Sequence, residues 1–198
     1  MNARAERADR EGAASGVSSP SSTPSVSSDP MQNIEFKAEL RDIDLARTLL
    51  RKIHATAIDT LAQTDTYYRL SDGRLKKRET RGHPTEFIFY HRDNAARARV
   101  SRFTIYSQSQ ARQHFGPTEL PVWLKVVKVR EVYMHSNVRI HLDRVEGLGN
   151  FIEFEALVTS QTPEQACYQA VELLKQAMLP VMGEMLSHSY CDMVAVDE

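Results

Sequence analysis

Two glutamates that stand two residues apart, Glu153 and Glu155, have the type and spacing to bind a metal ion. They alternate with Ile152, Phe154 and Ala156, and this period of two predicts a β-strand that carries both carboxylates on one face. Carboxylate oxygens are preferred ligands of hard divalent cations. The simpler interpretation is a one-sided antiparallel strand whose charged face meets water.

The segment before this strand alternates in the same way. Arg139, His141 and Asp143 share one face, and a glycine-containing turn at 147–149 predicts that the two segments form a β-hairpin. Eight cations fall on the polar faces of this and other alternating segments: Lys37, Lys76, Arg78, Arg92, Arg99, Lys128, Arg130 and Arg139. The anions on these faces are Glu35, Glu39, Asp143, Glu153 and Glu155. The surplus of cations predicts a ligand with several negative charges.

A phosphate chain fits this charge pattern. Arginine and lysine bind phosphate oxygens through forked and point-charge hydrogen bonds. An acidic cluster that faces them suits a divalent cation, which can bridge the same phosphates. The residues therefore predict a metal-bound triphosphate, a small molecule, as the ligand.

The rest of the sequence supplies the elements that must position these side chains. Alternation predicts strands over residues 32–40, 63–70, 74–79, 86–92, 99–106 and 122–133, in addition to the hairpin. Helical spacing predicts a helix from an Asp42 cap to His54, and another that opens at a capping box of Thr162 and Gln165 and ends near Pro180. A short helix is predicted over residues 181–188, and residues 108–121 are irregular or helical.

These strands put their polar side chains on one face and their apolar side chains on the other. If the sheet closes into a barrel, the apolar face points outward under the helices and the polar face lines the lumen. Buried ions are costly unless they are paired, so such a lumen stays wet, pairs internally or binds an opposite charge. If it closes in this way, the sheet gives an α+β fold with a closed antiparallel β-barrel, a polar charged lumen and helices packed outside.

Length and composition set further limits. The 198 residues suffice for one domain, with a disordered Ser/Pro-rich tail predicted at 1–30 and the folded domain at 31–198. A regulated arm and a start-site artefact are the alternatives for the tail. The net charge of −1 gives no global field for nucleic acid or an anionic membrane. Two cysteines without metal spacing, no long apolar run and no secretory signal favour a cytoplasmic location.

A series of motifs in the same order carries a family resemblance. They lie at residues 33–38 (for an E-x-E-x-K signature), 63–68, 73–79, 90–92, 127–130, 139–143 and 153–155. Over residues 33–190 the chain resembles the CYTH domain, also called the triphosphate tunnel metalloenzymes, in its branch of class IV adenylate cyclases. The resemblance implies a closed, eight-stranded antiparallel barrel, which agrees with the lumen expected above.

The resemblance also implies roles for individual residues. Glu35, Glu153 and Glu155 would hold Mg²⁺ or Mn²⁺, with Asp143 near a second metal position, and Glu35, Lys37 and Arg139 would take part in catalysis. Phosphates would be bound by Lys37, Lys76, Arg78, Arg92, Arg99, Lys128, Arg130 and Arg139. The role of Arg99 has the weakest basis because its strand is the most variable part of the family match. The first glutamate of the signature is Asn33 here, which removes one carboxylate from the second metal position.

Some lumenal residues keep two interpretations. Gln63, Asp65 and Tyr67 match the second strand of the family or serve turn capping and barrel packing. His141 is expected to be a hydrogen-bonded lumenal histidine rather than a catalytic base.

Three functions share this predicted site. The branch resemblance favours a cyclase that converts ATP to cyclic AMP and pyrophosphate. The alternatives are a triphosphatase for thiamine triphosphate, inorganic triphosphate or a nucleoside triphosphate, and a polyphosphate-binding module without catalysis. No nucleic-acid or membrane partner is expected, and a homodimer is one option for assembly.

Overall fold

A nine-stranded antiparallel sheet forms the body of the protein in the computed structural model, which describes residues 30–92, 95–118 and 120–195. The strands are β1 (Met31–Leu40), β2 (Thr56–Tyr68), β3 (Arg74–Thr80), β4 (Glu86–Arg92), β5 (Arg99–Tyr106), β6 (Val122–His135), β7 (Val138–Val145), β8 (Gly149–Leu157) and β9 (Met182–Met185). The helices within these residues are α1 (Ile43–Lys52), α2 (Gln108–Phe115), α3 (Glu164–Met178) and α4 (Tyr190–Val194), with a 3₁₀ turn at Leu179–Val181. The predicted tail lies almost wholly outside the described residues.

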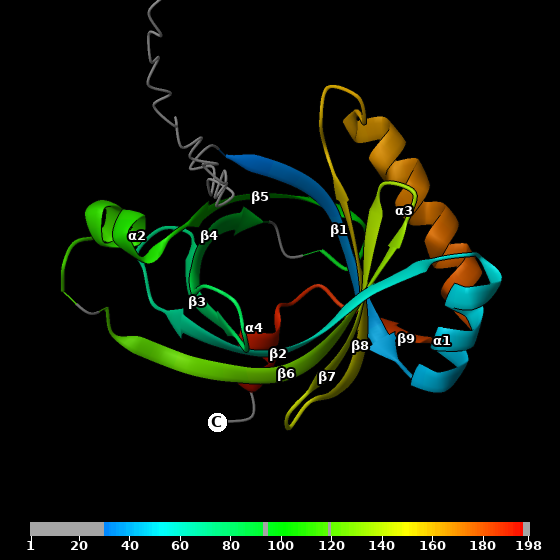
Figure 1. Ribbon diagram of the computed structural model, residues 1–198, viewed down its shortest axis with the longest axis horizontal. Helices are drawn as coiled ribbons and strands as arrows, with labels where there is room; N and C mark the ends of the chain where they lie inside the picture. The colour runs from blue at the N-terminus through cyan, green and yellow to red at the C-terminus, as the bar shows by residue number, and fades with distance from the viewer. Residues whose placement is uncertain (1–29, 93–94, 119, 196–198) are drawn as a thin grey trace, which may run out of the picture.

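Eight of these strands close into a barrel in the order β5-β4-β3-β2-β6-β7-β8-β1, and Figure 1 looks into it. β1 closes the ring because it pairs with two neighbours. Its residues 33–39 pair with β8, and on its other edge residues 31–35 pair with β5. The second half of that edge carries β9, through Ala38 and Leu40. The predicted α+β fold with a closed antiparallel barrel is confirmed.

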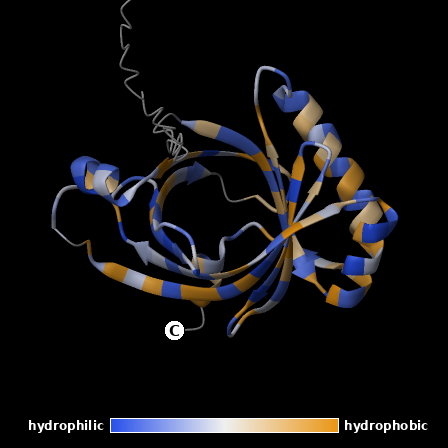
Figure 2. Cartoon of the chain, viewed as in Figure 1, coloured by the Kyte–Doolittle hydropathy of each residue, from blue (hydrophilic) through white to orange (hydrophobic). Residues whose placement is uncertain are grey.

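The larger of two hydrophobic clusters lies outside the barrel wall, as the alternation predicts, and a second one surrounds Phe151 and Tyr190. Ile34, Phe36, Ile140 and Phe154 are fully buried on the outer faces of β1, β7 and β8. α1 and α3 cover these faces and contribute further buried apolar residues: Ala46, Leu50, Val171, Leu174 and Met178. The two helices stand together on one side of the barrel, and the alternating hydropathy of the strands is visible along β6 (Figures 1 and 2).

The ends of α1 show why it stops where it does. A side-chain oxygen of Asp42 accepts hydrogen bonds from the backbone N–H groups of Asp44, at 3.0 Å, and Leu45, at 2.8 Å, so the predicted N-cap is present. The helix ends at Lys52, two residues earlier than predicted, because His54 adopts a left-handed φ of 58°.

Two local predictions near the C-terminus are wrong. The predicted capping box of α3 is absent because the hydroxyl of Thr162 donates instead to the carbonyl of Leu157, at 2.9 Å, and Pro163 is the N-cap residue. Residues 182–185, predicted as helical, form β9, since β1 offers them a free edge beyond the end of β5. The following helix, α4, begins only at Tyr190.

α4 differs from the other helices in its position. Its first residue, Tyr190, lines the barrel cavity together with Ser189, and the Tyr190 ring packs on Phe151 with the centroids 5.0 Å apart. α1, α2 and α3 lie outside the barrel as expected, and α4 in addition contributes Tyr190 to the lumen. Among the described helices, none is long and apolar enough to cross a membrane.

Candidate functional site

A cavity of about 210 Å³ occupies the lumen, and side chains from all eight barrel strands and α4 line it. The predicted site residues that line it are Glu35, Lys37, Lys76, Arg78, Lys128, Arg130, Arg139, Glu153 and Glu155. Alternation brings them together because each strand of a barrel points every second side chain inward. Arg99 and Asp143 are buried beside this cavity. The side chain of Arg92 lies outside the described part of the structure, and the exposed Glu39 meets the backbone of Glu184 instead of the lumen.

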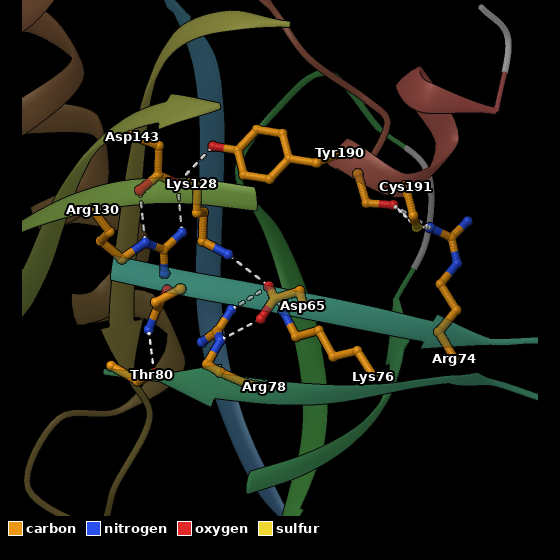
Figure 3. A network of polar contacts seen from close by, with 12 residues as sticks. Asp65, Arg74, Lys76, Arg78, Thr80, Lys128, Arg130, Asp143, Tyr190 and Cys191 are labelled. Carbon is orange, nitrogen blue, oxygen red and sulfur yellow. Dashed lines mark hydrogen bonds and ion pairs between the residues drawn. The ribbon is translucent and has the colours of Figure 1, made fainter. Parts of the chain in front are cut away.

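A basic wall is built around Asp65, which lies on β2 (Figure 3). Arg78 donates two hydrogen bonds to its carboxylate, at 2.7 and 2.8 Å, and Lys128 donates one at 2.6 Å. The Nζ atom of Lys76 lies 3.5 Å from the same carboxylate. Three cations thus share one anion, so this wall keeps a local excess of positive charge. Asp65 serves as their internal counterion, a role that neither interpretation of its sequence position included.

Burial shifts the protonation equilibria of this wall. It lowers the pKa of Lys128 to about 7, and the nearby Arg78 and Arg130 act in the same direction against the opposing charge of Asp65. It also lowers the pKa of Lys76. Burial opposes ionisation of Asp65, but the charges of Arg78, Lys128 and Lys76 outweigh it and hold the pKa of that carboxyl well below its usual range. The cations of this wall therefore repel one another, and an anionic ligand would reduce this repulsion.

A second network surrounds Arg130. Its guanidinium binds Asp143 through two hydrogen bonds, at 2.7 and 2.6 Å, and reaches Oε2 of Glu153 at 2.7 Å. Tyr190 donates its hydroxyl to Asp143 at 2.7 Å (Figure 3). Lys37 lies 3.4 Å from Oε2 of Glu153 and 3.5 Å from the centroid of the Tyr190 ring. These contacts fix the side chain of Asp143 on both oxygens.

The charges of this network keep its acids ionised. Burial raises the pKa of Asp143, but Arg130 outweighs it and the result is about 2. Burial likewise opposes ionisation of Glu153, whose pKa is nevertheless held well below its usual range by Lys37 and Arg130. Both carboxylates are therefore anionic at neutral pH.

One group of donor atoms in the described structure has the spacing to hold a metal ion. It comprises His141, Glu153 and Glu155, whose ligand atoms lie within 4.8 Å of one another. The two predicted carboxylates are thus brought together. Glu35 and Asp143 do not belong to this group: Arg99 binds Glu35 at 3.1 Å, and Arg130 and Tyr190 bind Asp143.

His141 departs from its expected state. It is 2% exposed, as a lumenal residue should be, but its Nδ1 atom has no hydrogen-bond partner. The predicted hydrogen-bonded histidine is therefore not what the structure shows at Nδ1. Asn33 has a similarly unpartnered Oδ1 in the lumen. Arg139 stands at the rim, with its side chain 55% exposed and 3.9 Å from the Glu155 carboxylate.

An apolar wall completes the cavity. Ile88 on β4 faces Ile105 on β5, and Phe103 stands beside them, with Glu86 at the same wall. No function was expected for these residues, although the alternation within 86–92 and 99–106 marks them as lumenal. Tyr190 could not be assigned to the lumen from the sequence because it does not belong to an alternating segment.

A second cavity of about 310 Å³ lies outside the barrel, between α2 and the outer face of β3 and β4. It contains scattered cations such as Lys77, Arg112 and Lys125, and among its lining residues the carboxylate is that of Glu79, which pairs with Lys77 at 2.9 Å. This cavity lacks the clustered anions of the lumen. The lumen is therefore the candidate site.

Comparison with known proteins agrees with the observed fold. The model of the CYTH domain family matches residues 31–181, and no curated protein matches the chain. The PH1012 protein from Pyrococcus horikoshii shares the fold with a TM-score of 0.65 and 21% identity, over 81% of this chain and 98% of that one. A candidate adenylate cyclase from Vibrio parahaemolyticus gives a TM-score of 0.61 and 16% identity, over 82% and 97%.

A protein from Hippeastrum is also similar in fold. It is described as a candidate adenylyl cyclase with a dominant triphosphatase activity, and it gives a TM-score of 0.58 at 13% identity, over 85% of this chain and 96% of that one. At these identities the likeness concerns the fold.

Proposed function

The chain belongs to the CYTH domain family, and from this membership and the charges of its lumen we propose that it is a metal-dependent enzyme that acts on a triphosphate. The observation that carries the proposal is the placement of two unlike walls in one cavity. Lys76, Arg78 and Lys128 share a single carboxylate on one wall, and Glu153 and Glu155 stand together on another. A polyphosphate with a divalent cation complements both.

Each wall has a role in this proposal. The basic wall binds phosphate oxygens, and Arg139 and Lys37 lie where they can contact the same chain of phosphates. Glu153 and Glu155 hold Mg²⁺ or Mn²⁺, and Arg130 keeps Glu153 in place. When bound, the cation neutralises charge that develops on the phosphate oxygens. Glu35, paired with Arg99, lies opposite Glu155 on the neighbouring strand and supports this acidic side of the site.

The apolar wall favours a nucleotide over inorganic triphosphate. Ile88, Phe103 and Ile105 offer a surface on which a nucleobase can pack, and the carboxylate of Glu86 can accept a hydrogen bond from an exocyclic amine. We therefore place ATP first among the substrates. The corresponding reaction is that of a class IV adenylate cyclase, in which the ribose 3′-hydroxyl attacks the α-phosphorus and pyrophosphate leaves.

A triphosphatase is the second candidate, and the observation in its favour is the similarity to the Hippeastrum protein, which is described by a dominant triphosphatase activity. The same cations and the same acidic pair would stabilise attack by water on the γ-phosphorus. Inorganic triphosphate or thiamine triphosphate would then serve as substrates alongside ATP.

Product analysis tests these assignments. The full chain is incubated with ATP, inorganic triphosphate or thiamine triphosphate under Mg²⁺ or Mn²⁺, and the products are separated by chromatography. Cyclic AMP and pyrophosphate identify the cyclase, and orthophosphate identifies the triphosphatase. Glu155→Gln should abolish turnover of every substrate because it removes one charge of the acidic pair.

A second variant tests the apolar wall. Phe103→Ala should raise KM for ATP by roughly tenfold, since losing one buried contact of this size costs on the order of 1–2 kcal/mol, and should leave inorganic triphosphate unaffected. An equal effect on both substrates would place the nucleobase elsewhere. Turnover without any divalent cation would contradict the proposed function as a whole.

A further inference from the structure

His141 is a buried side chain whose Nδ1 atom has no hydrogen-bond partner. Its Nδ1 lies 3.7 Å from Oε2 of Glu153 and 3.8 Å from Oε1 of Glu155. Both distances are too long for a hydrogen bond, and an unsatisfied polar atom at 2% exposure calls for an explanation. The nitrogen is nonetheless aimed at the space between the two carboxylates that the proposed metal site requires.

The strands hold the three residues in this arrangement. His141 stands directly opposite Glu153 in the β7–β8 pairing, and Glu155 is the next lumenal residue along β8. Arg130 and Lys37 both reach Oε2 of Glu153, so its other oxygen carries neither of these contacts. Because the residues lie in paired strands and not in loops, the three donors are positioned before any ion arrives.

The spacing of the donors suits a small divalent ion. Ligand atoms that bind one ion at about 2.1 Å lie at most about 4.2 Å apart. Nδ1 lies below this limit from Oε1 of Glu155, at 3.8 Å, whereas its 3.7 Å contact with Glu153 is to Oε2, the oxygen that Arg130 and Lys37 reach. The ligand atoms of the whole group lie within 4.8 Å, slightly above the limit. Small side-chain rotations would therefore bring all three atoms onto one ion.

We propose that His141 binds the metal through Nδ1 as a third protein ligand, which makes the site a mixed nitrogen and oxygen site that prefers Mn²⁺ or another first-row transition ion to Mg²⁺. The inference rests on the proposed function for the presence of a metal, and it adds the ligand and the metal preference. Imidazole is a good ligand for transition ions, whereas Mg²⁺ is bound mainly by oxygen atoms and water.

The nitrogen ligand can be observed directly. Mn²⁺ is added to the full chain, and pulsed electron paramagnetic resonance records the coupling of the bound ion to nitrogen. We expect a ¹⁴N coupling in the wild type that changes to a ¹⁵N coupling when the histidines are ¹⁵N-labelled. The coupling should disappear in His141→Gln and persist in His135→Gln, a matched control at the end of β6, where His135 lines a surface cavity beside α3.

Metal affinity gives an independent measurement. His141→Gln should weaken Mn²⁺ binding by about 10-fold to 100-fold. Losses of this size are typical when a residue that hydrogen-bonds to a metal ligand is replaced, and loss of a ligand itself should cost at least as much. Mg²⁺ binding, measured by competition against Mn²⁺, should change by less than about threefold, so that the preference for Mn²⁺ falls.

The outcomes separate this inference from the proposed function. Mn²⁺ that binds the wild type without a nitrogen coupling, yet is lost in Glu155→Gln, would overturn the role of His141 and leave the carboxylate site intact. Mn²⁺ binding that both Glu153→Gln and Glu155→Gln retain would overturn the metal site itself. The wild-type spectrum decides the question even if His141→Gln does not fold.

Discussion

Individual charges in the lumen are paired more completely than their sequence pattern indicates. Asp65 alone neutralises part of the charge of Arg78, Lys128 and Lys76, and Arg130 is bound by two acids. The cations are therefore held in fixed positions before a ligand arrives, which lowers the cost of ordering them on binding. A triphosphate would compete with Asp65 for the same donors, so ligand binding and protonation of this wall are coupled.

Lys128 provides the test of this coupling. Its pKa is lowered to about 7 by burial, so it is largely neutral at pH 8. A bound triphosphate should raise this pKa because it adds negative charge, and binding at pH 8 without metal should take up close to one proton. Calorimetry in two buffers with different ionisation enthalpies measures the uptake, which should vanish in Lys128→Met and shrink toward pH 6.

The same shift has a consequence for stability. The folded pKa of Lys128 lies below that of an unfolded lysine, 10.5, so between about pH 7 and 10.5 the unfolded chain holds a proton that the folded chain lacks. This residue's contribution to the free energy of unfolding should therefore rise with pH across that window. If triphosphate binding at pH 8 takes up no proton, the lowered pKa of Lys128 is contradicted.

Among the secondary-structure elements, β9 leads the chain from α3 back to the barrel. Its pairing with β1 brings the carbonyl of Leu186 within 3.2 Å of Arg99, which binds Glu35. The residues that follow carry Tyr190 into the lumen. This strand lies close to β1, and at Gly183 a Cβ atom would stand 2.7 Å from Oε2 and 2.9 Å from Cβ of Glu39.

Gly183→Ala should therefore destabilise the protein by about 1–3 kcal/mol, the usual cost of overpacking. Thermal or urea unfolding measures the loss. Glu39→Gly removes both clashing atoms, Oε2 and Cβ, so the double variant should recover part of the stability, and the double-mutant cycle should give a coupling of opposite sign to the single loss. Additive effects of the two substitutions would show that Gly183 and Glu39 do not limit the approach of β9.

At the scale of the whole molecule, the barrel and its covering helices form a unit that shares a hydrophobic core. The family match begins at residue 31. The core residues on β1, β7, β8, α1 and α3 all lie within this unit. We therefore propose that residues 31–198 fold independently of the segment before them, as the sequence indicates.

Deletion of residues 1–30 tests this boundary. The segment is rich in serine and proline and offers little apolar area to bury, while ordering it would cost about 1–2 kcal/mol per residue. The melting temperature of the shortened chain should match that of the full chain within about 2 °C, since a change of 1 kcal/mol shifts it by about 2–4 °C at this size. Triphosphate binding should also be unchanged. A large drop in melting temperature would show that the segment docks on the barrel.

Most of the lumenal residues could be identified from the sequence. Alternation assigned each strand a polar and an apolar face, so that Glu153, Glu155, Arg78 and Lys128 were expected to meet in one cavity if the sheet closed. The reason is that side-chain direction in a strand depends only on local backbone geometry. The family resemblance added the strand number and the triphosphate ligand.

Tertiary structure decided which lumenal residues meet. Asp65 finds its partners on β3 and β6, Arg99 reaches Glu35 only because β5 closes onto β1, and Tyr190 enters from a helix outside any alternating segment. Glu35 likewise lies opposite Glu155 but pairs with Arg99 and does not join the donor group of His141, Glu153 and Glu155. Such contacts depend on strand register and on the path of the chain between elements, which are set by long-range packing and leave no signal in a local pattern.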